Sequence, residues 1–127
     1  LPAESEPVEN TSQPFLLDPA VRKELQTAMS RGAGVLRSAD SLIETSNALS
    51  RLEARHSDAP QVDAWETTNL FQLAQTILRA ALIRQETRGS HWREDFPETS
   101  AAREKRIVQQ IDDVGSWATE FAQVINK

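Results

Sequence analysis

The clearest hydrophobic pattern along the chain lies in residues 64–88, where apolar side chains recur at helical spacing. They form one continuous band made of Leu70, Leu73, Ala74, Ile77, Leu78, Ala81 and Leu82. Apolar positions three and four residues apart share one face of a helix, so this segment is predicted to be helical. The band is wider than a single contact requires, which indicates packing on more than one side. Gly89 is expected to end the helix, because glycine readily adopts the left-handed conformation found there.

Two further helices are predicted ahead of this segment. Asp18 and Pro19 suit the N-cap and the first position of a short helix, whose apolar stripe is Val21, Leu25 and Met29. A break is expected at residues 30–34, where two glycines interrupt the pattern. A second helix is predicted over residues 35–55, in which spacings of three and four residues separate Val35, Ala39, Leu42, Ser46, Leu49 and Leu52.

The last predicted helix covers residues 101–126. Its expected apolar face consists of Ile107, Ile111, Val114, Ala118, Phe121 and Ile125, with Trp117 beside them in the core. No segment shows the strict alternation that is typical of a strand. The predicted fold is therefore all-α: an antiparallel three-helix bundle of the spectrin-repeat type, formed by residues 35–55, 64–88 and 101–126 and preceded by the short N-terminal helix.

The chain is predicted to form one domain behind a linker. Residues 1–17 contain three prolines and little apolar surface, too little to offset the entropy of ordering, so they are predicted to be a disordered linker. Residues 18–127 then make up a single helical domain, which their number suits. The linker, together with a first residue that is leucine, leads us to expect a further domain upstream.

Composition narrows the classes of function. The absence of cysteine excludes disulfides and thiolate sites and makes the cytoplasm the expected compartment. A formal net charge of -5 argues against a nucleic-acid-binding face. No apolar run approaches the roughly 20 residues of a membrane helix. His56 and His91 are too far apart for a helical metal-binding pair, and residues 32–34 lack the strand and third glycine of a nucleotide-binding loop, so neither ligand is expected.

The densest polar cluster occupies residues 84–97. Its candidate site residues are Arg84, Glu86, Arg88, Gly89, His91, Trp92, Arg93, Asp95, Phe96 and Pro97. One interpretation is an anion-binding or acid–base site, because arginines can clamp an anion and histidine titrates near neutral pH. The other is a helix end and loop whose charges pair with one another or with a neighbouring domain, and the spacing favours it. Trp92 fits a contact anchor and a local packing residue equally well, and no catalytic, cofactor-binding or metal-binding residue is predicted.

The same cluster carries a resemblance to a known family. Residues 84–97 match the pattern Arg-x-Glu-Ser-Arg-Gly-x-His-x-Arg-x-Asp-aromatic-Pro, with Thr87 in place of the serine. This long pattern resembles the C-terminal domain of the flavoproteins that include L-aspartate oxidase, succinate dehydrogenase and fumarate reductase. A second segment, residues 34–42, begins Gly-Val-Leu-Arg-Ser and is most similar to the L-aspartate oxidase branch.

The resemblance implies a parent enzyme that oxidises L-aspartate to iminoaspartate with FAD and supplies quinolinate for NAD biosynthesis. It implies FAD-binding and capping domains earlier in the same chain, so that FAD belongs to the parent enzyme and this fragment holds no cofactor and catalyses nothing alone. The ten cluster residues are then expected to fix their loop or to dock it on the FAD domain. Two alternatives stay open: the equivalent domain of a succinate dehydrogenase or fumarate reductase, which the sequence after Pro97 disfavours, and a freestanding helical module that binds a partner.

Overall fold

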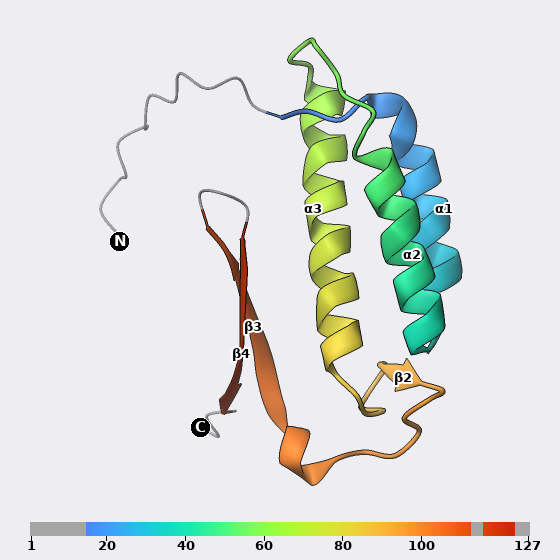
Figure 1. Ribbon diagram of the computed structural model, residues 1–127, viewed down its shortest axis with the longest axis vertical. Coiled ribbons are helices and arrows are strands. Elements are labelled where there is room, and N and C mark those ends of the chain that lie inside the picture. Colours follow the sequence, from blue (N-terminus) through green and yellow to red (C-terminus); the bar gives the residue numbers. More distant parts are fainter. Residues whose placement is uncertain (1–14, 113–115, 124–127) are drawn as a thin grey trace.

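The computed structural model describes residues 15–112 and 116–123. Within them the elements follow in this order: η1 (Pro19–Val21), α1 (Arg22–Gly32), β1 (Leu36–Arg37), α2 (Ala39–Leu52), α3 (Val62–Ile83), β2 (Trp92–Arg93), η2 (Ala101–Arg103), β3 (Lys105–Ile111) and β4 (Trp117–Gln123). The strands form two separate sheets, a parallel pair β1–β2 and an antiparallel hairpin β3–β4. Figure 1 shows the three helices side by side, with the hairpin on the opposite side of α3 from α1 and α2.

The three helices alternate in direction and enclose the hydrophobic core (Figure 1). Buried apolar side chains from η1 and all three helices meet between them: Val21, Leu25, Leu42, Leu49, Leu52, Phe71, Ala74, Leu78 and Ala81. The three- and four-residue spacings place these side chains on the inner face of each helix. None of the helices in the described residues is both long and apolar enough to cross a membrane.

The segment before η1 belongs to this core, so the prediction of a linker over residues 1–17 is wrong at its C-terminal end. Leu16 and Leu17 are buried. The N–H of Leu17 donates to the Thr68 hydroxyl at 2.9 Å, and the N–H of Ser57 donates to the Leu16 carbonyl at 2.8 Å. Both bonds tie the segment to α3 and to the loop after α2. Residues 1–14 of the predicted linker lie outside the described residues.

The predicted boundaries around α1 are confirmed. The carboxylate of Asp18 accepts the N–H of Ala20 at 2.9 Å and caps η1, which continues into α1. α1 ends at Gly32, inside the break predicted at residues 30–34. A Cβ atom on Gly32 would overlap the Thr45 hydroxyl of α2, so the close approach of α1 and α2 requires glycine at this position.

α2 begins later than predicted, at Ala39 rather than residue 35. The Ser38 hydroxyl accepts the N–H of Ser41, and the Ser41 hydroxyl accepts the N–H of Ser38. This reciprocal capping box fixes the start of the helix. Leu36 and Arg37 are thereby left outside the helix and pair with β2.

α3 ends earlier than predicted, at Ile83 rather than near Arg88. The guanidinium of Arg93 donates to the carbonyls of Ala81 and Leu82, at 2.7 and 3.2 Å. These carbonyls of the last turn would otherwise need the N–H groups of a continuing helix, so the side chain takes the place of a further turn.

Gly89 has the predicted left-handed conformation, but it does not end a helix. Its φ is 58°, and it is the first central residue of the two-residue turn between Arg88 and His91, whose backbone groups bond each other at 2.9 and 3.0 Å. A positive φ at this position is typical of a tight hairpin turn and favours glycine.

The predicted last helix, residues 101–126, is wrong, because this part of the chain forms the hairpin β3–β4. Its register runs from Lys105 opposite Gln123 to Ile111 opposite Trp117. The pairs Ile107–Phe121 and Ile111–Trp117 share one face of the ladder, so the apolar pattern also fits a period of two. Val114 and Ile125, two residues of the predicted helix face, lie outside the described residues. The chain is mostly helical, but its two small sheets make the all-α class wrong. Two helices of the predicted bundle are present as α2 and α3, whereas the third α-helix is α1, part of the predicted N-terminal helix.

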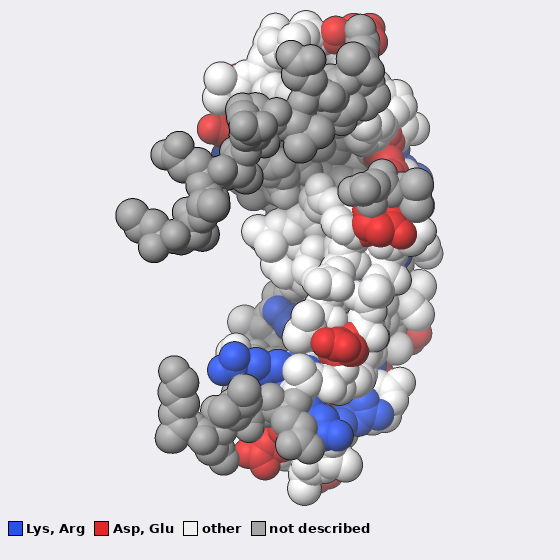
Figure 2. Space-filling view, turned by 90° about the vertical axis from the view of Figure 1, so that its left-hand side faces the viewer, with Lys and Arg blue, Asp and Glu red and all other residues white. Residues whose placement is uncertain are grey.

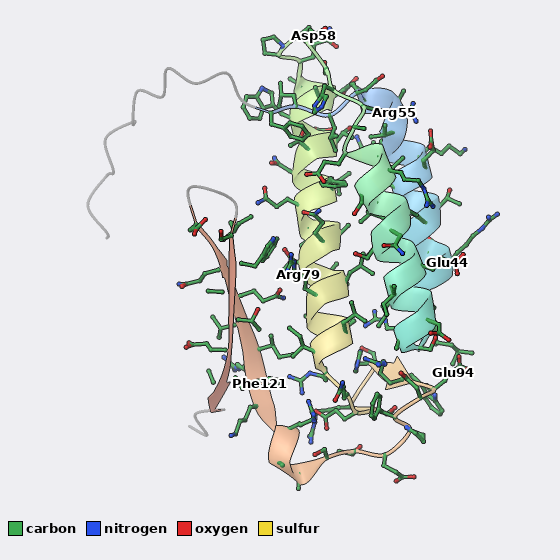
Figure 3. All side chains as sticks on the ribbon, viewed as in Figure 1. Glu44, Arg55, Asp58, Arg79, Glu94 and Phe121 are labelled. Carbon is green, nitrogen blue, oxygen red and sulfur yellow. The ribbon has the colours of Figure 1, made fainter. Side chains whose placement is uncertain are left out.

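The hairpin rests on α3. The side-chain amide of Gln109 donates to the Thr76 carbonyl at 2.9 Å, and the guanidinium of Arg79 lies 4.8 Å from the centre of the Trp117 ring. Figure 3 shows Arg79 on the side of α3 that faces the hairpin. Trp117, predicted to be a core residue, is half-buried in this contact. α3 thus contacts the hairpin as well as the other helices. Leu73 and Ile77 of its apolar band remain 55% and 38% exposed, so these contacts do not cover the whole band.

Candidate functional site

The predicted polar cluster lies at one end of the helices, where α1 and α3 end and α2 begins (Figure 1). Its chain is the loop of residues 84–103, which contains β2. The parallel pairing of β1 with β2 sets Leu36 opposite Trp92 and Arg37 opposite Arg93. Because side chains alternate along a strand, the two arginines point towards the helices while Leu36 and Trp92 are largely exposed.

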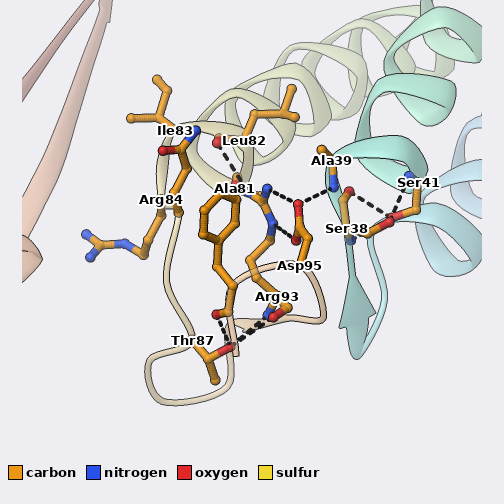
Figure 4. A network of polar contacts seen from close by, with 12 residues as sticks. Ser38, Ala39, Ser41, Ala81, Leu82, Ile83, Arg84, Thr87, Arg93 and Asp95 are labelled. Carbon is orange, nitrogen blue, oxygen red and sulfur yellow. Dashed lines mark hydrogen bonds and ion pairs between the residues drawn. The ribbon is translucent and has the colours of Figure 1, made fainter. Parts of the chain in front are cut away.

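Arg93 is the buried centre of the site. Its side chain is 1% exposed, and its Nε and Nη2 atoms each donate to one carboxylate oxygen of Asp95 at 2.7 Å. Its Nη1 atom binds the last turn of α3, and its guanidinium carbon lies 5.1 Å from the centre of the Phe96 ring. Figure 4 shows the guanidinium between the end of α3 and the Asp95 carboxylate. A planar, five-donor cation suits this arrangement, because two parallel donors meet both carboxylate oxygens while Nη1 stays free for the helix end.

Asp95 connects this centre to α2. Its Oδ2 atom accepts the N–H of Ala39, the first residue of the helix, at 3.0 Å. An anion at a helix N-terminus is favourable, because the free N–H groups and the helix dipole both stabilise negative charge. The hydrogen bonds from Arg93 hold the pKa of Asp95 well below its usual range, and the bond from Ala39 acts in the same direction.

Arg37 binds carbonyl groups at the end of α1, as Arg93 binds those at the end of α3. Its Nε atom donates to the carbonyls of Ala33 and Gly34, both at 3.1 Å, directly after the C-terminus of α1. Its Nη1 atom lies 3.1 Å from Nδ1 of His91. Its own carbonyl accepts the N–H of Glu94 at 2.7 Å, which prolongs the β1–β2 ladder by one bond.

His91 is neutral and bridges Arg37 and the end of α3. A guanidinium can only donate, so Nδ1 accepts from Arg37. Nε2 therefore carries the proton and donates to the Arg84 carbonyl at 3.0 Å. Burial lowers the pKa of His91, and although the bond to the Arg84 carbonyl opposes this, the positive charges of Arg37, Arg93 and Arg84 lower it further.

Glu86 forms a second buried centre in the same loop. Its side chain has no exposed surface, and it accepts from Nη1 of Arg84 at 2.6 Å, from Nε of Arg88 at 3.2 Å and from the N–H of Ser100 at 2.9 Å. Burial alone raises the pKa of Glu86, but the bonds from Ser100, Arg88 and Arg84 outweigh it and hold that pKa below its usual value. Arg84 also donates to the Lys105 carbonyl at 2.6 Å, which ties the loop to β3.

The hydroxyl of Thr87 binds backbone groups of the same loop. The hydroxyl accepts the N–H of Arg93 at 3.0 Å and faces the carbonyls of Arg93 and Phe96 at 3.2 and 2.9 Å. The backbone of Thr87 pairs with Glu98 and accepts the hydroxyl of Thr99. Serine and threonine supply the same donor and acceptor, so the departure from the family pattern preserves these bonds.

These contacts define a clasp, by which we mean Arg37, Glu86, His91, Arg93 and Asp95 with the groups they bind. The clasp joins the ends of all three helices through charge-assisted bonds. The ion pairs Arg84–Glu86, Arg88–Glu86 and Arg93–Asp95 lie within the domain, as the paired-charge interpretation of the sequence expects. In the described part of the chain, no group of three or more His, Cys, Asp or Glu side chains could hold a metal ion.

The structure brings together the six predicted residues that carry charge or can titrate: Arg84, Glu86, Arg88, His91, Arg93 and Asp95. Phe96 contacts Arg93, and Pro97 is exposed. Trp92 is half-exposed on the outer side of the ladder. Their role as a domain interface stays a prediction. On the face drawn in Figure 2, basic side chains gather at the height of this loop and the start of β3.

Arg37 and Ser100 take part in the clasp but were not among the predicted residues. Arg37 belongs to the segment Gly-Val-Leu-Arg-Ser, so the family resemblance was the signal that could have drawn attention to it. Ser100 takes part through its backbone N–H, a donor that every residue except proline possesses. No residue pattern therefore marks Ser100 in advance.

Comparison with known proteins places these observations in a family. Residues 22–121 match the family model described as fumarate reductase flavoprotein C-term. The L-aspartate oxidase of Streptomyces coelicolor is 43% identical over 102 residues, which make up 73% of this chain and 18% of that protein. A fumarate reductase (CoM/CoB) subunit from Methanothermobacter marburgensis is 36% identical over 98 residues, or 69% of this chain and 18% of that protein.

The fold is also that of a solved relative. The Mycobacterium smegmatis Sdh1 complex in its apo form contains a chain that superposes with a TM-score of 0.68 at 26% identity, covering 94% of this chain and 22% of that one. The chain thus spans about a fifth of the length of the relatives it matches. The family model covers the three helices, the clasp and β3, and the chain belongs to the fumarate reductase flavoprotein C-terminal family.

Proposed function

We propose that this chain is the C-terminal helical domain of an FAD-dependent L-aspartate oxidase. The parent enzyme oxidises L-aspartate to iminoaspartate, which feeds quinolinate formation and NAD biosynthesis. The observation that carries the proposal is the 43% identity to an L-aspartate oxidase over 102 residues. Since that match covers about a fifth of the relative, the flavin chemistry belongs to the rest of the protein. The cytoplasm is the proposed compartment, because a chain without cysteine needs no oxidising environment.

The role of the domain is structural. Its clasp holds its own helix ends together, and the domain docks against the FAD-binding and capping domains of the same chain. The clasp supports this role, because its cations and carboxylates are bound to one another and to helix ends rather than directed at a substrate. Catalytic groups, by contrast, must reach a reacting atom within hydrogen-bond distance. The fragment alone therefore catalyses nothing, and its partners are protein domains rather than nucleic acid, membrane or metal.

The residues present do not fit FAD. Among the described elements, β1 leads directly into α2, which is the order of elements that a dinucleotide site uses. In such a site the pyrophosphate lies on the free N–H groups of the helix N-terminus. Here the N–H of Ala39 is bound to the Asp95 carboxylate, and the N–H of Ser41 to the Ser38 hydroxyl. A carboxylate at this place repels a phosphate, so no step of the reaction is assigned to this chain.

A second candidate is the equivalent domain of a fumarate reductase or succinate dehydrogenase flavoprotein. The observation in its favour is the 36% identity to the fumarate reductase (CoM/CoB) relative. The lower identity and the sequence after Pro97 rank it behind the oxidase. A freestanding interaction module ranks third, because the relatives are about five times longer than this chain.

The test uses the complete protein that contains this chain. Flavin absorbance is recorded without oxygen, and L-aspartate is added to one sample and succinate to another. We expect L-aspartate to bleach the flavin and succinate to leave it oxidised. Bleaching by succinate alone would support the second candidate, and a complete protein that binds no flavin would overturn both.

The structural role is tested separately with Arg88→Ala, which removes a contact to the buried Glu86 carboxylate. We expect a lower melting temperature and weaker flavin retention in the complete protein. Arg51→Ala, at an exposed position of α2, is the matched control. Unchanged melting and flavin content in Arg88→Ala would contradict the bracing role.

A further inference from the structure

The β1–β2 ladder has an inverted arrangement of polar and apolar side chains. Arg37 and Arg93 point towards the helices, and Arg93 is almost fully buried. Leu36 and Trp92, which lie opposite each other, are 55% and 50% exposed, and Val35 beside them is 79% exposed. A small sheet that packs on helices normally turns its apolar side inward. The outer face of this ladder is therefore apolar surface that the helices leave uncovered.

The inward arginines hold this outer face in one position. Arg93 is bound to Asp95 and to the end of α3, and Arg37 to the end of α1 and to His91. A tryptophan on such a support loses little conformational freedom when it is covered. Aromatic side chains of this kind are the residues that most often dominate binding energy.

We propose that the outer face of the ladder, formed by Leu36, Trp92 and Val35, docks onto an apolar surface of the flavin-binding part of the same polypeptide. The proposal rests on the proposed function, which supplies that partner. It assigns the contact to the apolar side of the ladder, while the charged side chains of the clasp act within the domain. Trp92 thus faces the partner, and the charged side chains of the clasp hold the strand that carries Trp92 in place.

The length of the relatives supports a covalently joined domain as the occupant of this face. The chain spans about a fifth of them, so under the proposed function the rest of a protein of that length is covalently joined to this domain. A joined partner is present at high effective concentration, so a small apolar patch is enough to dock it. An independent partner would need a stable interface of about 1,200–2,000 Å², more than three side chains provide.

The direct test is the solvent accessibility of Trp92 in the complete flavoprotein. Native protein and protein unfolded in guanidinium are exposed to hydroxyl radicals, and oxidation of each tryptophan is quantified by mass spectrometry. In the domain alone Trp92 and Trp65 are similarly exposed, at 50% and 44%. We expect Trp92 to be oxidised about tenfold more slowly in the native protein than in the unfolded protein, because a buried side chain is poorly accessible to the radicals. Native oxidation of Trp92 at about half its unfolded rate overturns the proposal.

A pair of variants tests the same face by its energetics. Leu36→Gln places an amide in the proposed contact, whereas Val62→Gln makes the same change at an apolar residue that is 71% exposed at the far end of α3. We expect Leu36→Gln to raise the rate of Trp92 oxidation several-fold and to speed flavin loss, and Val62→Gln to do neither. Equal behaviour of the two variants overturns the proposal.

The outcomes separate this inference from the proposed function. Flavin that L-aspartate bleaches, in a protein whose Trp92 is freely oxidised, overturns the docking face and leaves the proposed function intact. A complete protein that binds no flavin overturns the proposed function and, with it, the occupant named here. Protection of Trp92 together with flavin that L-aspartate bleaches supports both.

Discussion

The guanidinium of Arg93 and the carboxylate of Asp95 form a two-pronged ion pair in which each partner also binds a different helix. Both bonds of the pair measure 2.7 Å. On one side Arg93 binds the last turn of α3, and on the other Asp95 accepts the first N–H of α2 at 3.0 Å. The cation meets a helix C-terminus and the anion a helix N-terminus, so both helix dipoles favour the arrangement.

Replacing Arg93 by alanine should therefore loosen two helices at once. Breaking a buried pair typically costs about 3–5 kcal/mol. Asp95 is 31% exposed and can regain water, so we expect a loss near the lower end, about 3 kcal/mol in the free energy of unfolding. Urea denaturation of the chain measures it, with Arg51→Ala as the control. A change below about 1 kcal/mol, the value of a surface pair, would contradict the clasp.

Acid should weaken the clasp through its two carboxylates. Asp95 and Glu86 both have pKa values below their ordinary 3.8 and 4.5 in the folded chain. A carboxyl group with a lowered folded pKa contributes stability above its unfolded pKa and loses it as the pH falls through the folded value. We expect stability to decline from about pH 4.5 downward, and Asp95→Asn to make that decline shallower while lowering stability at pH 7. Asp58→Asn, in an exposed loop, should keep the original slope in urea titrations at each pH.

His91 should add a second pH dependence at milder acidity. Its folded pKa is lowered from 6.5, first by burial and then by the nearby arginine charges. The unfolded chain therefore takes up the proton first, and stability is complete above pH 6.5 and falls below it, by at most about 1.4 kcal/mol per pH unit. Protonation of His91 also places a proton on its Nδ1 atom, which can then no longer accept the hydrogen bond from Arg37. His91→Gln should abolish the slope between pH 6.5 and 5 and His56→Gln should retain it, as measured by urea midpoints.

The helices could be predicted where the apolar pattern fits the period of a helix but not the period of two of a strand. The band of α3 extends over several turns, and no alternation of two accounts for neighbours such as Leu73 with Ala74. Ile107 and Ile111, like Trp117 and Phe121, are four residues apart, a spacing that fits one face of a helix and equally one face of a strand. The wrong helix over residues 101–126 follows from this ambiguity, which the pairing of β3 with β4 resolves.

The cluster was predictable because its charges are dense in the sequence, whereas its connections were not. The pairings Arg84–Glu86, Arg88–Glu86 and Arg93–Asp95 are each two residues apart. Arg37 and His91 are 54 residues apart, and only the folding of β1 against β2 brings them together. Local composition therefore indicates that a polar site exists, but the helix ends it serves depend on tertiary structure.

The last prediction concerns whether the hairpin β3–β4 can unfold separately from the helices. Two-stranded hairpins are at best marginally stable alone, so the packing of the Trp117 ring on α3, where it lies 4.8 Å from the Arg79 guanidinium, should stabilise β3 and β4. We expect Trp117→Ala to speed amide hydrogen exchange in β3 at least tenfold and to leave the core of α2 unchanged, since α2 packs on the other side of α3 (Figure 1). A double-mutant cycle with Arg79→Ala should give a coupling of about 0.5–1 kcal/mol. Trp65→Ala, at a half-exposed tryptophan near the start of α3, is the control for loss of a large ring. Equally fast exchange in α2 and β3 after Trp117→Ala would mean that the hairpin and the helices unfold as one unit.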